Sequence, residues 1–474
     1  MYNKLHGEAL FSMNSQNRRG VFVYFQKEFL MKSQINRRSF IKQTSLGIGA
    51  GFLIGNAFPS PSIAKDANPS SKLNIAHVGI ARQGAFSVNG CASENQIALC
   101  DANQKYLDAA KANHPNAKLY SDFRVMLDEM GSKLDAIVVA TPDHTHAIVA
   151  VSGMKLGLHC YSEKPLGHDL YQIRKMRQIA KDKNLTTQMG TQIHAGENYR
   201  RVVELIKAGA IGKVKDVKVW CSNRYVGEPK PKEKTPCPPE INWDVWLGPA
   251  AEREYDPRLI PGTWRKYWDF GNGAMGDMAC HYLDLPYWAL GLDKVMPISV
   301  KTTSPNPVDE EMCGYDLTAE YVFPGVPGTT DTLTLSWQDG NARPECLSEL
   351  GVEKFGAGVL FFGTDGILFS NYDEHALLPK EKFEGFEPHV QRIPKSLGHH
   401  AEWIDAIKKG KGASEDSTTC RFEYSGKLAE AVLLGCFSYR CGQKLEYDAQ
   451  NMKATNCPEA DKFFRQYCRP GWDV

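Results

Sequence analysis

Short apolar runs alternate with stretches of helical spacing in the chain after residue 72. The runs are four to six residues long, and the first three are rich in Val, Ile, Leu and Ala, which is typical of strands buried on both faces. They lie at residues 73–78, 96–100, 135–140 and 159–162. Helical spacing between them predicts helices over 102–113, 123–130 and 147–156. This alternation predicts an α/β fold, with a doubly wound parallel sheet, over residues 72–190.

The pattern changes beyond Gln188. A helix is expected over 199–208, followed by a strand of alternating apolar and polar residues over 214–219. Similar runs predict strands at 298–303, 315–323, 330–337 and 358–363, and helical spacing returns at 401–409 and 425–439. Alternation of this kind is typical of antiparallel sheets with one covered face. Residues 191–474 are therefore expected to form an α+β domain around a large, mostly antiparallel open sheet.

Composition adds limits to this picture. Of the 474 residues, 42% are apolar, which is enough for the cores of two or three domains. The 56 basic residues nearly balance the 55 acidic ones, so no nucleic-acid partner is indicated. The 13 cysteines are scattered, without a Cys-x-x-Cys pair or the spacing of metal ligands. We expect packed, reduced thiols and no metal site, with a disulfide scaffold as the alternative.

The first 71 residues predict an export signal and a linker. Asn36-Arg37-Arg38-Ser39-Phe40-Ile41-Lys42 precedes a glycine-containing apolar run over 46–58, and Ser62-Ile63-Ala64 offers a cleavage site near residue 64. The paired arginines resemble a twin-arginine signal, which predicts a periplasmic protein that uses the twin-arginine export machinery. An uncleaved N-terminal anchor is the alternative. Met31 lies just before the signal and is a second candidate for the start of translation.

A glycine-rich turn directly follows the first strand. Gly79, Ala81 and Gly84 occupy the three glycine positions of the dinucleotide fingerprint, in which a pyrophosphate approaches the start of a helix. Ala81 places a methyl group at the middle position, and Arg82 follows it. Asp101 ends the second strand, 22 residues after Gly79, where an acidic residue accepts hydrogen bonds from the adenosine ribose. This spacing favours NAD over NADP, and a strand-end cap is the alternative role of Asp101.

Two polar segments follow later strands, at the edge where open α/β sheets bind ligands. Thr141-Pro142-Asp143-His144-Thr145-His146 ends the third strand, and Glu163-Lys164-Pro165 ends the fourth. Pro165 fixes the backbone after the lysine and so limits where its ammonium group points. The Lys-Pro bond is also a place where a cis peptide can occur. The residues expected at the cofactor are Thr141, Pro142, His144, His146, Glu163 and Lys164.

A glycine-rich segment in the second half carries a carboxylate and a histidine. In Gly271-Asn272-Gly273-Ala274-Met275-Gly276-Asp277-Met278-Ala279-Cys280-His281, Asp277 and His281 are four residues apart, so on a helix they share a face. A histidine of near-neutral pKa can take the proton of an alcohol while hydride leaves its carbon. A partly desolvated Lys164 can hydrogen-bond the same oxygen and stabilise its developing charge. A helix-surface ion pair is the alternative for Asp277 and His281.

With these segments the chain, from about residue 72 to 443, resembles the family named after glucose–fructose oxidoreductase, inositol dehydrogenase and the rhizopine-catabolism oxidoreductase (Gfo/Idh/MocA). The turn over 79–84, Ala140-Thr141-Pro142 with His146, Glu163-Lys164-Pro165 and the segment ending at His281 carry the resemblance. It implies an NAD-binding Rossmann domain and a C-terminal domain for substrate binding and oligomerisation. It also implies a catalytic group of Lys164, Asp277 and His281, with Gln192 near the nicotinamide. A homodimer or homotetramer is expected, because the open sheet of such folds commonly pairs across subunits.

A long segment over 227–262 is rich in Pro, Lys and Glu. A loop of this length is usually functional or disordered, and its aromatic residues argue against disorder. Trp264 and Arg265 follow it and are expected in the substrate site, since aromatic faces stack on sugars and arginine binds hydroxyls or carboxylates. A packed core is the alternative for the tryptophans. His194 is expected in the same cleft, beside Lys164, Asp277 and His281.

These features predict an exported NAD-dependent oxidoreductase that acts on a secondary alcohol of a sugar, a glycoside or a cyclitol. An exported enzyme meets little free NAD, so its cofactor is expected to stay tightly bound. One alternative is a glycosidase that oxidises a sugar transiently and eliminates its substituent. Lys164 counts against that alternative, because glycosidases of this kind lack the Glu-Lys-Pro motif. The other alternative is a non-catalytic sugar- or NAD-binding protein, which Ala81 would favour by weakening the cofactor site.

Overall fold

The computed structural model describes residues 71–229, 231, 233–386 and 392–474. The predicted export signal, its cleavage position at Ala64 and the alternative start at Met31 lie outside these residues. Within the described ranges, no helix is both long and apolar enough to cross a membrane. All 13 cysteines fall within the ranges, and all are free thiols, as the sequence predicted.

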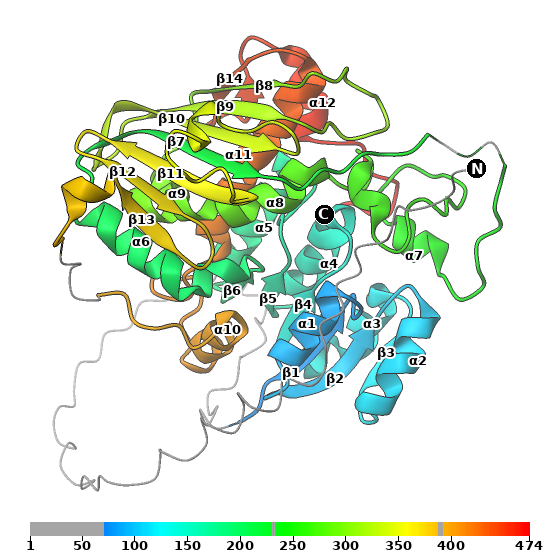
Figure 1. Ribbon diagram of the computed structural model, residues 1–474. Helices are drawn as coiled ribbons and strands as arrows, with labels where there is room; N and C mark the ends of the chain where they lie inside the picture. The colour runs from blue at the N-terminus through cyan, green and yellow to red at the C-terminus, as the bar shows by residue number, and fades with distance from the viewer. Residues whose placement is uncertain (1–70, 230, 232, 387–391) are drawn as a thin grey trace, which may run out of the picture. The chain divides into compact units, whose positions relative to one another are not determined.

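The first sheet has six strands among the described residues, and every pair is parallel (Figure 1). They are β1 (Asn74–Val78), β2 (Asn95–Cys100), β3 (Lys118–Tyr120), β4 (Ala136–Val139), β5 (His159–Ser162) and β6 (Thr187–Met189). Every residue of β4 and β5 is buried, as in parallel sheets that helices cover on both faces. The order β3-β2-β1-β4-β5-β6 reverses between β1 and β4, and such a reversal opens a ligand crevice. The predicted doubly wound sheet is confirmed.

Five helices connect and cover these strands. They are α1 (Gln83–Gly90), α2 (Gln104–Asn113), α3 (Phe123–Met130), α4 (Asp143–Lys155) and α5 (Leu170–Asp182). The side chains of Asn103, Asp122 and Asp169 cap α2, α3 and α5 by accepting backbone hydrogen bonds. α4 begins four residues earlier than the sequence predicted, because the φ of −59° at Pro142 suits a helix start and Asp143 favours the first turn. Residues 143–146 are therefore helical.

The second sheet has nine strands in the described part of the chain and is antiparallel except where β7 pairs with β10. Its order is β13-β12-β11-β7-β10-β9-β8-β14-β15. The strands are β7 (Val214–Cys221), β8 (Ser299–Thr303), β9 (Thr318–Pro324), β10 (Thr329–Asp339), β11 (Ala357–Gly363), β12 (Ile367–Ser370), β13 (His375–Leu378), β14 (Leu445–Asp448) and β15 (Lys453–Ala454). The predicted mostly antiparallel open sheet is confirmed.

Helices pack on this second sheet and join it to the first half of the fold. They include α6 (Glu197–Lys207), α8 (Gly273–Tyr282), α9 (Asp284–Leu290) and α11 (Phe422–Cys441). α11 is buried along almost its whole length and contacts β8, α8 and α5. The two halves therefore share one continuous apolar core around α11.

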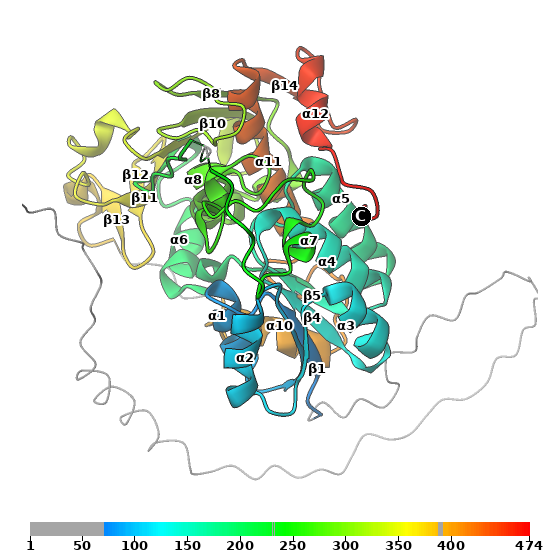
Figure 2. The same cartoon turned by 90° about the vertical axis from the view of Figure 1, so that its right-hand side faces the viewer.

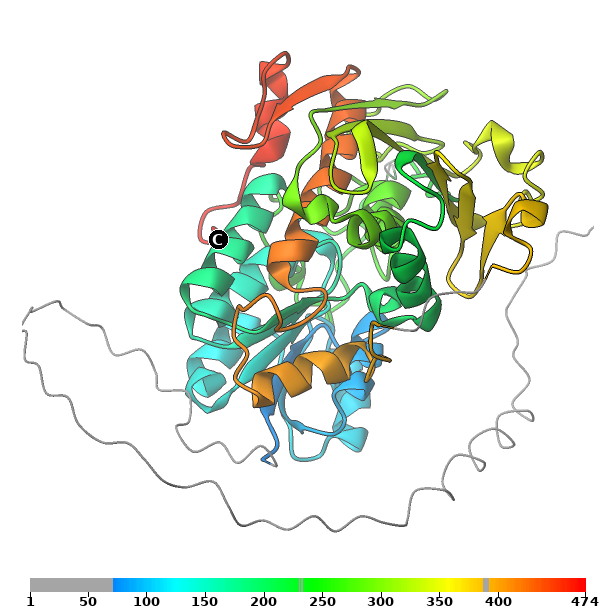
Figure 3. The ribbon, with the colours of Figure 1, turned by 90° about the vertical axis from the view of Figure 1, so that its left-hand side faces the viewer.

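The chain also returns to the first sheet late in the sequence. In α10 (His399–Lys408), Trp403, Ile404 and Ile407 pack with Ile75 and Tyr161 of the parallel sheet. Figure 3 shows α10, in orange, beside the blue beginning of that sheet. A helix from the C-terminal half therefore covers part of the sheet that carries the glycine-rich turn.

The segment over 227–262 leaves the end of β7 and runs to the first sheet. It contains the short helix α7 (Trp243–Leu247), and a 3₁₀ turn (Thr263–Lys266) follows it. Figure 2 shows α7, in green, beside α4, in cyan. Between these helices, Nε2 of His144 lies 3.0 Å from the carbonyl oxygen of Trp246. The segment thus links the two halves of the fold. The last helix, α12 (Asp461–Phe464), lies near the C-terminus.

Candidate active site

A cavity of about 360 Å³ opens at the carboxyl ends of β1, β2, β4 and β5. The turns after these strands form part of its wall, and residues 241–265 and α8 contribute another part. Fourteen residues predicted from the sequence line it: Gly79, Ala81, Arg82, Asp101, Thr141, Pro142, His146, Glu163, Lys164, Gln192, Trp264, Arg265, Asp277 and His281. Both predicted motif groups, from the first half and the second, therefore meet in one cavity.

Two glycines let the turn after β1 pack closely on the sheet. Gly79 has a φ of 79°, and a Cβ there would lie 2.5 Å from the carbonyl oxygen of Ala140. A Cβ on Gly84 would collide with the carbonyl group of Gly79. Gly84 is buried beneath the turn and does not line the cavity, so its role is to bring α1 close to the sheet.

The start of α1 offers unpaired backbone donors. No described residue accepts a hydrogen bond from the amides of Ala81, Arg82 or Gln83, and α1 has no side-chain cap. Arg82 has a φ of 53°, a left-handed conformation that non-glycine residues rarely adopt. Free amides at the positive end of a helix bind phosphate oxygens. The turn therefore fits the pyrophosphate of a dinucleotide, even with alanine at position 81.

Asp101 anchors the turn and the start of α2. Its carboxylate accepts hydrogen bonds from the amides of Ile80 (3.1 Å) and Asn103 (3.0 Å). Burial raises the pKa of Asp101 to about 6, although both amides favour the ionised form. Asp101 therefore acts as a cap at the end of the strand, the alternative role that the sequence offered. An ionised carboxylate at neutral pH retains further acceptor positions, which fit ribose hydroxyls at the cavity wall.

His146 joins two strand-end segments. Its Nδ1 lies 2.7 Å from the carbonyl oxygen of Pro165, and its Nε2 lies 2.7 Å from that of Thr141. Burial lowers the pKa of His146 to about 4, while the two carbonyl groups act in the opposite direction. The ring thereby fixes the Glu-Lys-Pro segment against the turn after β4. The Lys164–Pro165 peptide bond is cis.

Glu163 is a buried carboxyl at the cavity wall, with 4% of its surface exposed. Its Oε1 accepts hydrogen bonds from Nε2 of Gln192 (2.8 Å) and of Gln83 (3.2 Å), and Oε2 has no partner among the described residues. Burial raises the pKa of Glu163 to about 7, although the charge of Lys164 lowers it. Gly190 provides the space for the carboxyl group, since a Cβ there would lie 2.5 Å from it.

Asp277 is the centre of a charged network on α8. Lys164 forms an ion pair with its Oδ1 and donates to its carbonyl oxygen at 2.9 Å. Nε of Arg265 donates to Oδ1 at 3.1 Å, and the Tyr225 hydroxyl donates to Oδ2 at 2.6 Å. The side chains of Lys164 and Asp277 are only 10% and 11% exposed. The pair is therefore largely removed from solvent and satisfied by its neighbours.

Both members of this pair stay charged. Burial disfavours the ammonium of Lys164, but the charge of Asp277 outweighs burial and raises the pKa of the lysine. Burial likewise disfavours the carboxylate, but Lys164 and Arg265 hold the pKa of Asp277 well below its usual range. Two of the three N–H donors of Lys164 contact Asp277, so one remains for a ligand oxygen.

His281 follows Asp277 by one helical turn, and both line the cavity, as their spacing predicted. In the described part of the chain no residue forms a hydrogen bond with its imidazole ring, and only its carbonyl oxygen accepts one. Burial and the charge of Lys164 together lower the pKa of His281 to about 3, although Asp277 acts in the opposite direction. The ring is therefore neutral at physiological pH, the state in which it can accept a proton.

His144 was predicted at the cofactor but does not line the cavity. Its Nε2 lies 3.0 Å from the carbonyl oxygen of Trp246, and its ring packs edge-on against Phe270 at 5.0 Å. The cause is the early start of α4, which turns residue 144 toward α7. His144 therefore holds the segment over 227–262 against α4.

His194 is fully buried and does not line the cavity either. Its Nδ1 lies 2.8 Å from Oδ2 of Asp284, and its ring stacks on Trp288 with centroids 4.0 Å apart. Cys420 completes a group whose ligand-type atoms lie within 4.8 Å of one another, the one such group found in the described ranges. Asp284 already accepts from the Tyr424 hydroxyl at 2.8 Å. His194 thus ties the turn after β6 to α9 rather than contacting a substrate in the cavity.

Several residues that line or contact the cavity were not predicted from the sequence to have a function. Asp143 lies within a quoted motif, lines the cavity and is 2% exposed. Burial raises the pKa of Asp143 to about 7, while Arg265 and Lys164 lower it. Tyr225 contacts Asp277 across 52 residues of chain, which no local pattern reveals. The aromatic content of the segment over 227–262 was the signal for its cavity residues, which are Ile241, Val245, Trp246, Ile260 and Pro261.

Two domain models match the chain. Residues 73–191 match the NAD-binding Rossmann fold of an oxidoreductase family, and residues 200–323 match its C-terminal alpha/beta domain. The levoglucosan dehydrogenase of Pseudarthrobacter phenanthrenivorans is 25% identical over 200 residues, 41% of this chain and 42% of the relative. A glycosyl hydrolase family 109 protein of Shewanella is 21% identical over 258 residues, 49% and 50% of the two chains. The chain thus spans about half the length of the curated relatives it matches.

Solved structures share the fold. The WlbA dehydrogenase of Bordetella pertussis, in complex with NADH and UDP-GlcNAcA, has a TM-score of 0.55 at 16% identity, over 80% of this chain and 99% of that one. The apo scyllo-inositol dehydrogenase of Lactobacillus casei has a TM-score of 0.50 at 16% identity, over 79% and 98%. With both domain models matched in order, the chain belongs to the Gfo/Idh/MocA family of oxidoreductases.

Proposed function

We propose that the protein is an NAD-dependent oxidoreductase that transfers hydride between nicotinamide and a secondary alcohol of a sugar, a glycoside or a cyclitol. The observation that carries the proposal is the meeting of Lys164, Asp277 and His281 with the turn over 79–84 in one cavity. Two similar proteins are named for the dehydrogenation of levoglucosan and of scyllo-inositol, which supports this substrate class.

Different side chains of the cavity accept the proton and stabilise the developing charge. NAD, when bound, supplies the hydride acceptor. The neutral ring of His281 accepts the hydroxyl proton, and the free N–H of Lys164 holds the same oxygen and stabilises its developing charge. Asp277 keeps Lys164 and Arg265 charged and in place. Arg265 lies 4.2 Å over the Trp264 ring with its terminal nitrogens unpaired among the described residues, so this wall meets the rest of the substrate.

The proposal assigns NAD rather than NADP as the cofactor. Asp101 directly follows β2, is partly buried and is ionised at neutral pH, so it favours ribose hydroxyls and repels a 2′-phosphate. The proposal also includes tight binding of NAD, since the expected export would remove the enzyme from the cytoplasmic pool. Extraction of denatured, purified protein should yield nicotinamide dinucleotide, and its absence would contradict tight binding.

A second candidate is a glycosidase that works by transient oxidation of the sugar. Family 109 glycosyl hydrolase proteins are among the similar proteins. Asp143 provides a further buried carboxyl at the cavity wall, a suitable acid for a departing substituent. Lys164, within Glu-Lys-Pro, favours the dehydrogenase. Release of an aglycone without accumulation of reduced nicotinamide would identify the glycosidase.

The proposal extends to the location and assembly of the protein. The paired arginines Arg37 and Arg38 support export to the periplasm through the twin-arginine machinery. Replacement of both by lysine should retain the protein in the cytoplasm. The broad second sheet supports a homodimer or homotetramer, which light scattering of the purified protein would measure.

The experiment that tests the function is a panel of glycosides and cyclitols. Purified protein is mixed with each compound, and the absorbance of reduced nicotinamide and the products are followed together. The expected result is reduction of nicotinamide with formation of a ketone from one structural class of the panel. No reaction with any member in either direction, despite bound NAD, would favour a non-catalytic binding protein.

A further inference from the structure

A long segment from the second half reaches across to the first sheet, and we call residues 238–262 of it the strap. The amide of Gln104 donates to the carbonyl oxygen of Glu240 at 2.8 Å, and the amide of Asn242 donates to that of Ala102 at 2.7 Å. Lys105 forms an ion pair with the Glu240 carboxylate. The strap is therefore joined to the rim of the cavity directly after β2.

The strap supplies apolar surface at this end of the cavity. Ile241 and Val245 line the cavity together with apolar residues of the first half. Those residues are Ala102, Tyr106, Phe123 and Val149. These apolar residues lie beside Asp101, whose carboxylate fits the ribose, and apolar contacts stabilise the flat adenine ring of a bound dinucleotide. The strap thus completes an apolar lining that the Rossmann half begins.

The other end of the strap covers the glycine-rich turn. Ile260 and Pro261 line the cavity there. Gly262 leaves room for Arg82, since a Cβ on Gly262 would lie 2.8 Å from Nη1 of the arginine. Arg82 carries one of the free amides that fit the pyrophosphate. The strap therefore extends from the adenosine end of the dinucleotide site to its phosphate end.

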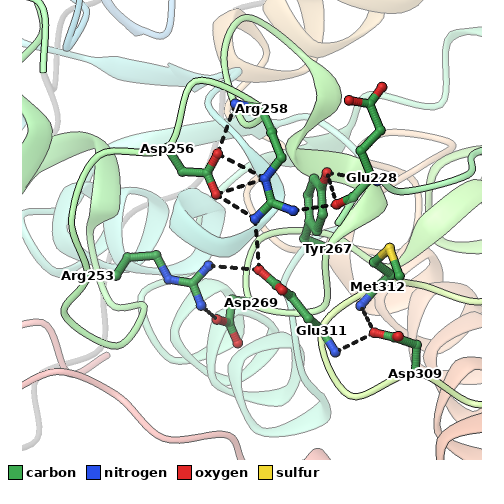
Figure 4. Close-up of polar contacts among 9 residues, drawn as sticks. All are labelled: Glu228, Arg253, Asp256, Arg258, Tyr267, Asp269, Asp309, Glu311 and Met312. Carbon is green, nitrogen blue, oxygen red and sulfur yellow. Dashed lines mark hydrogen bonds and ion pairs between the residues drawn. The ribbon is translucent and has the colours of Figure 1, made fainter. Parts of the chain in front are cut away.

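An ion-pair network holds the strap in place (Figure 4). Arg258, with a side chain only 8% exposed, binds Asp256 at 2.6 Å and Glu311 at 3.0 Å. Arg253 lies 3.8 Å from the same Glu311 carboxylate. The Asp309 carboxylate fixes Glu311 by accepting a hydrogen bond from its backbone amide at 2.8 Å. Because Glu311 lies outside the strap, the network ties the strap to the loop before β9.

We infer that the strap is the second half of the cofactor site and retains the dinucleotide over many turnovers. This inference rests on the proposed function, because it takes the cavity to be the site of NAD. Release requires the backbone hydrogen bonds of Glu240 and Asn242 to break together and the apolar lining to withdraw, while Glu311 resists the movement. Exchange with free dinucleotide is then slower than turnover.

The test is exchange of bound cofactor, measured without substrate. Full-length protein isolated with NAD is mixed with an excess of deuterium-labelled NAD, and the bound fraction is analysed by mass spectrometry over time. Glu311→Gln removes the one carboxylate charge that Arg258 and Arg253 share. Glu310→Gln, at the exposed neighbouring position, is the matched control. Ile241→Ala shortens the apolar lining without touching the anchor.

The expected result is exchange about tenfold faster or more in Glu311→Gln and in Ile241→Ala, with Glu310→Gln unchanged. Wild-type exchange as fast as turnover would overturn the inference. Unchanged exchange in both variants, with normal circular dichroism, would also overturn it. Either result leaves the proposed oxidoreductase activity standing, because NAD still binds, although fast exchange in the wild type would also contradict tight binding. A protein that takes up no NAD at all would overturn the proposed function as well.

Discussion

Glu163→Gln tests the electrostatics of the cavity wall directly. Glu163 is 4% exposed, and its pKa rises from 4.5 to about 7 because burial disfavours the carboxylate. Its Oε1 accepts hydrogen bonds that a glutamine oxygen can also accept, and its Oε2 has no described partner. Glutamine therefore mimics the protonated acid in size and in hydrogen bonding, and it cannot ionise.

The sign and magnitude follow from the two pKa values. Because the folded-state pKa lies above the unfolded value, the stabilising contribution is complete below about pH 4.5 and is lost as pH rises through about 7. The loss corresponds to about 3 kcal/mol, since each pH unit between the two values is worth about 1.4 kcal/mol. Glu163→Gln should match wild type near pH 4.5 and exceed its free energy of unfolding by about 3 kcal/mol above pH 8.

Urea unfolding followed by tryptophan fluorescence, at several pH values from about 4.5 to 8.5, measures this difference. Glu310→Gln is the matched control, because it makes the same substitution at an exposed position. A stability difference between Glu163→Gln and wild type that varies with pH by less than about 0.5 kcal/mol would refute the reasoning. A difference that falls as pH rises would refute it also.

Three further substitutions test the site. Lys164→Ala should lower the free energy of unfolding at neutral pH by about 3 kcal/mol, because Asp277 stays buried with only Arg265 and Tyr225 as partners. The low pKa of Asp277 means that this stabilisation exists above its ordinary titration range and is lost on acidification, so urea unfolding should show a smaller effect near pH 3. Tyr225→Phe should cost about 1 to 2 kcal/mol in a thermal or urea assay and lower kcat more than it raises KM, since the hydroxyl acts through Asp277; an unchanged kcat would exclude this positioning role. Asp101→Asn should reduce the preference for NAD over NADP by about tenfold or more in fluorescence titrations of both cofactors, and an unaltered ratio would remove Asp101 from the ribose site.

The sequence predicts the elements whose burial leaves a periodic signal. The helix over 123–130 and the strand over 159–162 have the expected bounds, because both lie in a continuous apolar core. α5 is also visible in the helical spacing of Ile173, Met176 and Ala180, although it was not among the predicted elements. Periodicity reports which face of an element is buried, and that information is local.

The contacts that define the site are not local. His144 turns away from the cavity because α4 begins at Asp143, a difference of four residues in one helix boundary. His194 meets Asp284 across 90 residues of sequence, so its burial has no signal in its own neighbourhood. By contrast, Asp277 and His281 could be paired from the sequence because one helical turn sets their relation.

The most direct test of the central claim is the single-turnover rate of nicotinamide reduction in wild type and in His281→Ala. The substrate is the best compound of the glycoside and cyclitol panel, and dinucleotide content is measured in both proteins. The account predicts a rate at least about a hundredfold lower in His281→Ala with NAD still bound, because the hydroxyl proton loses its acceptor. A rate within about threefold of wild type would contradict the assignment of His281, and with it the proposed catalytic group.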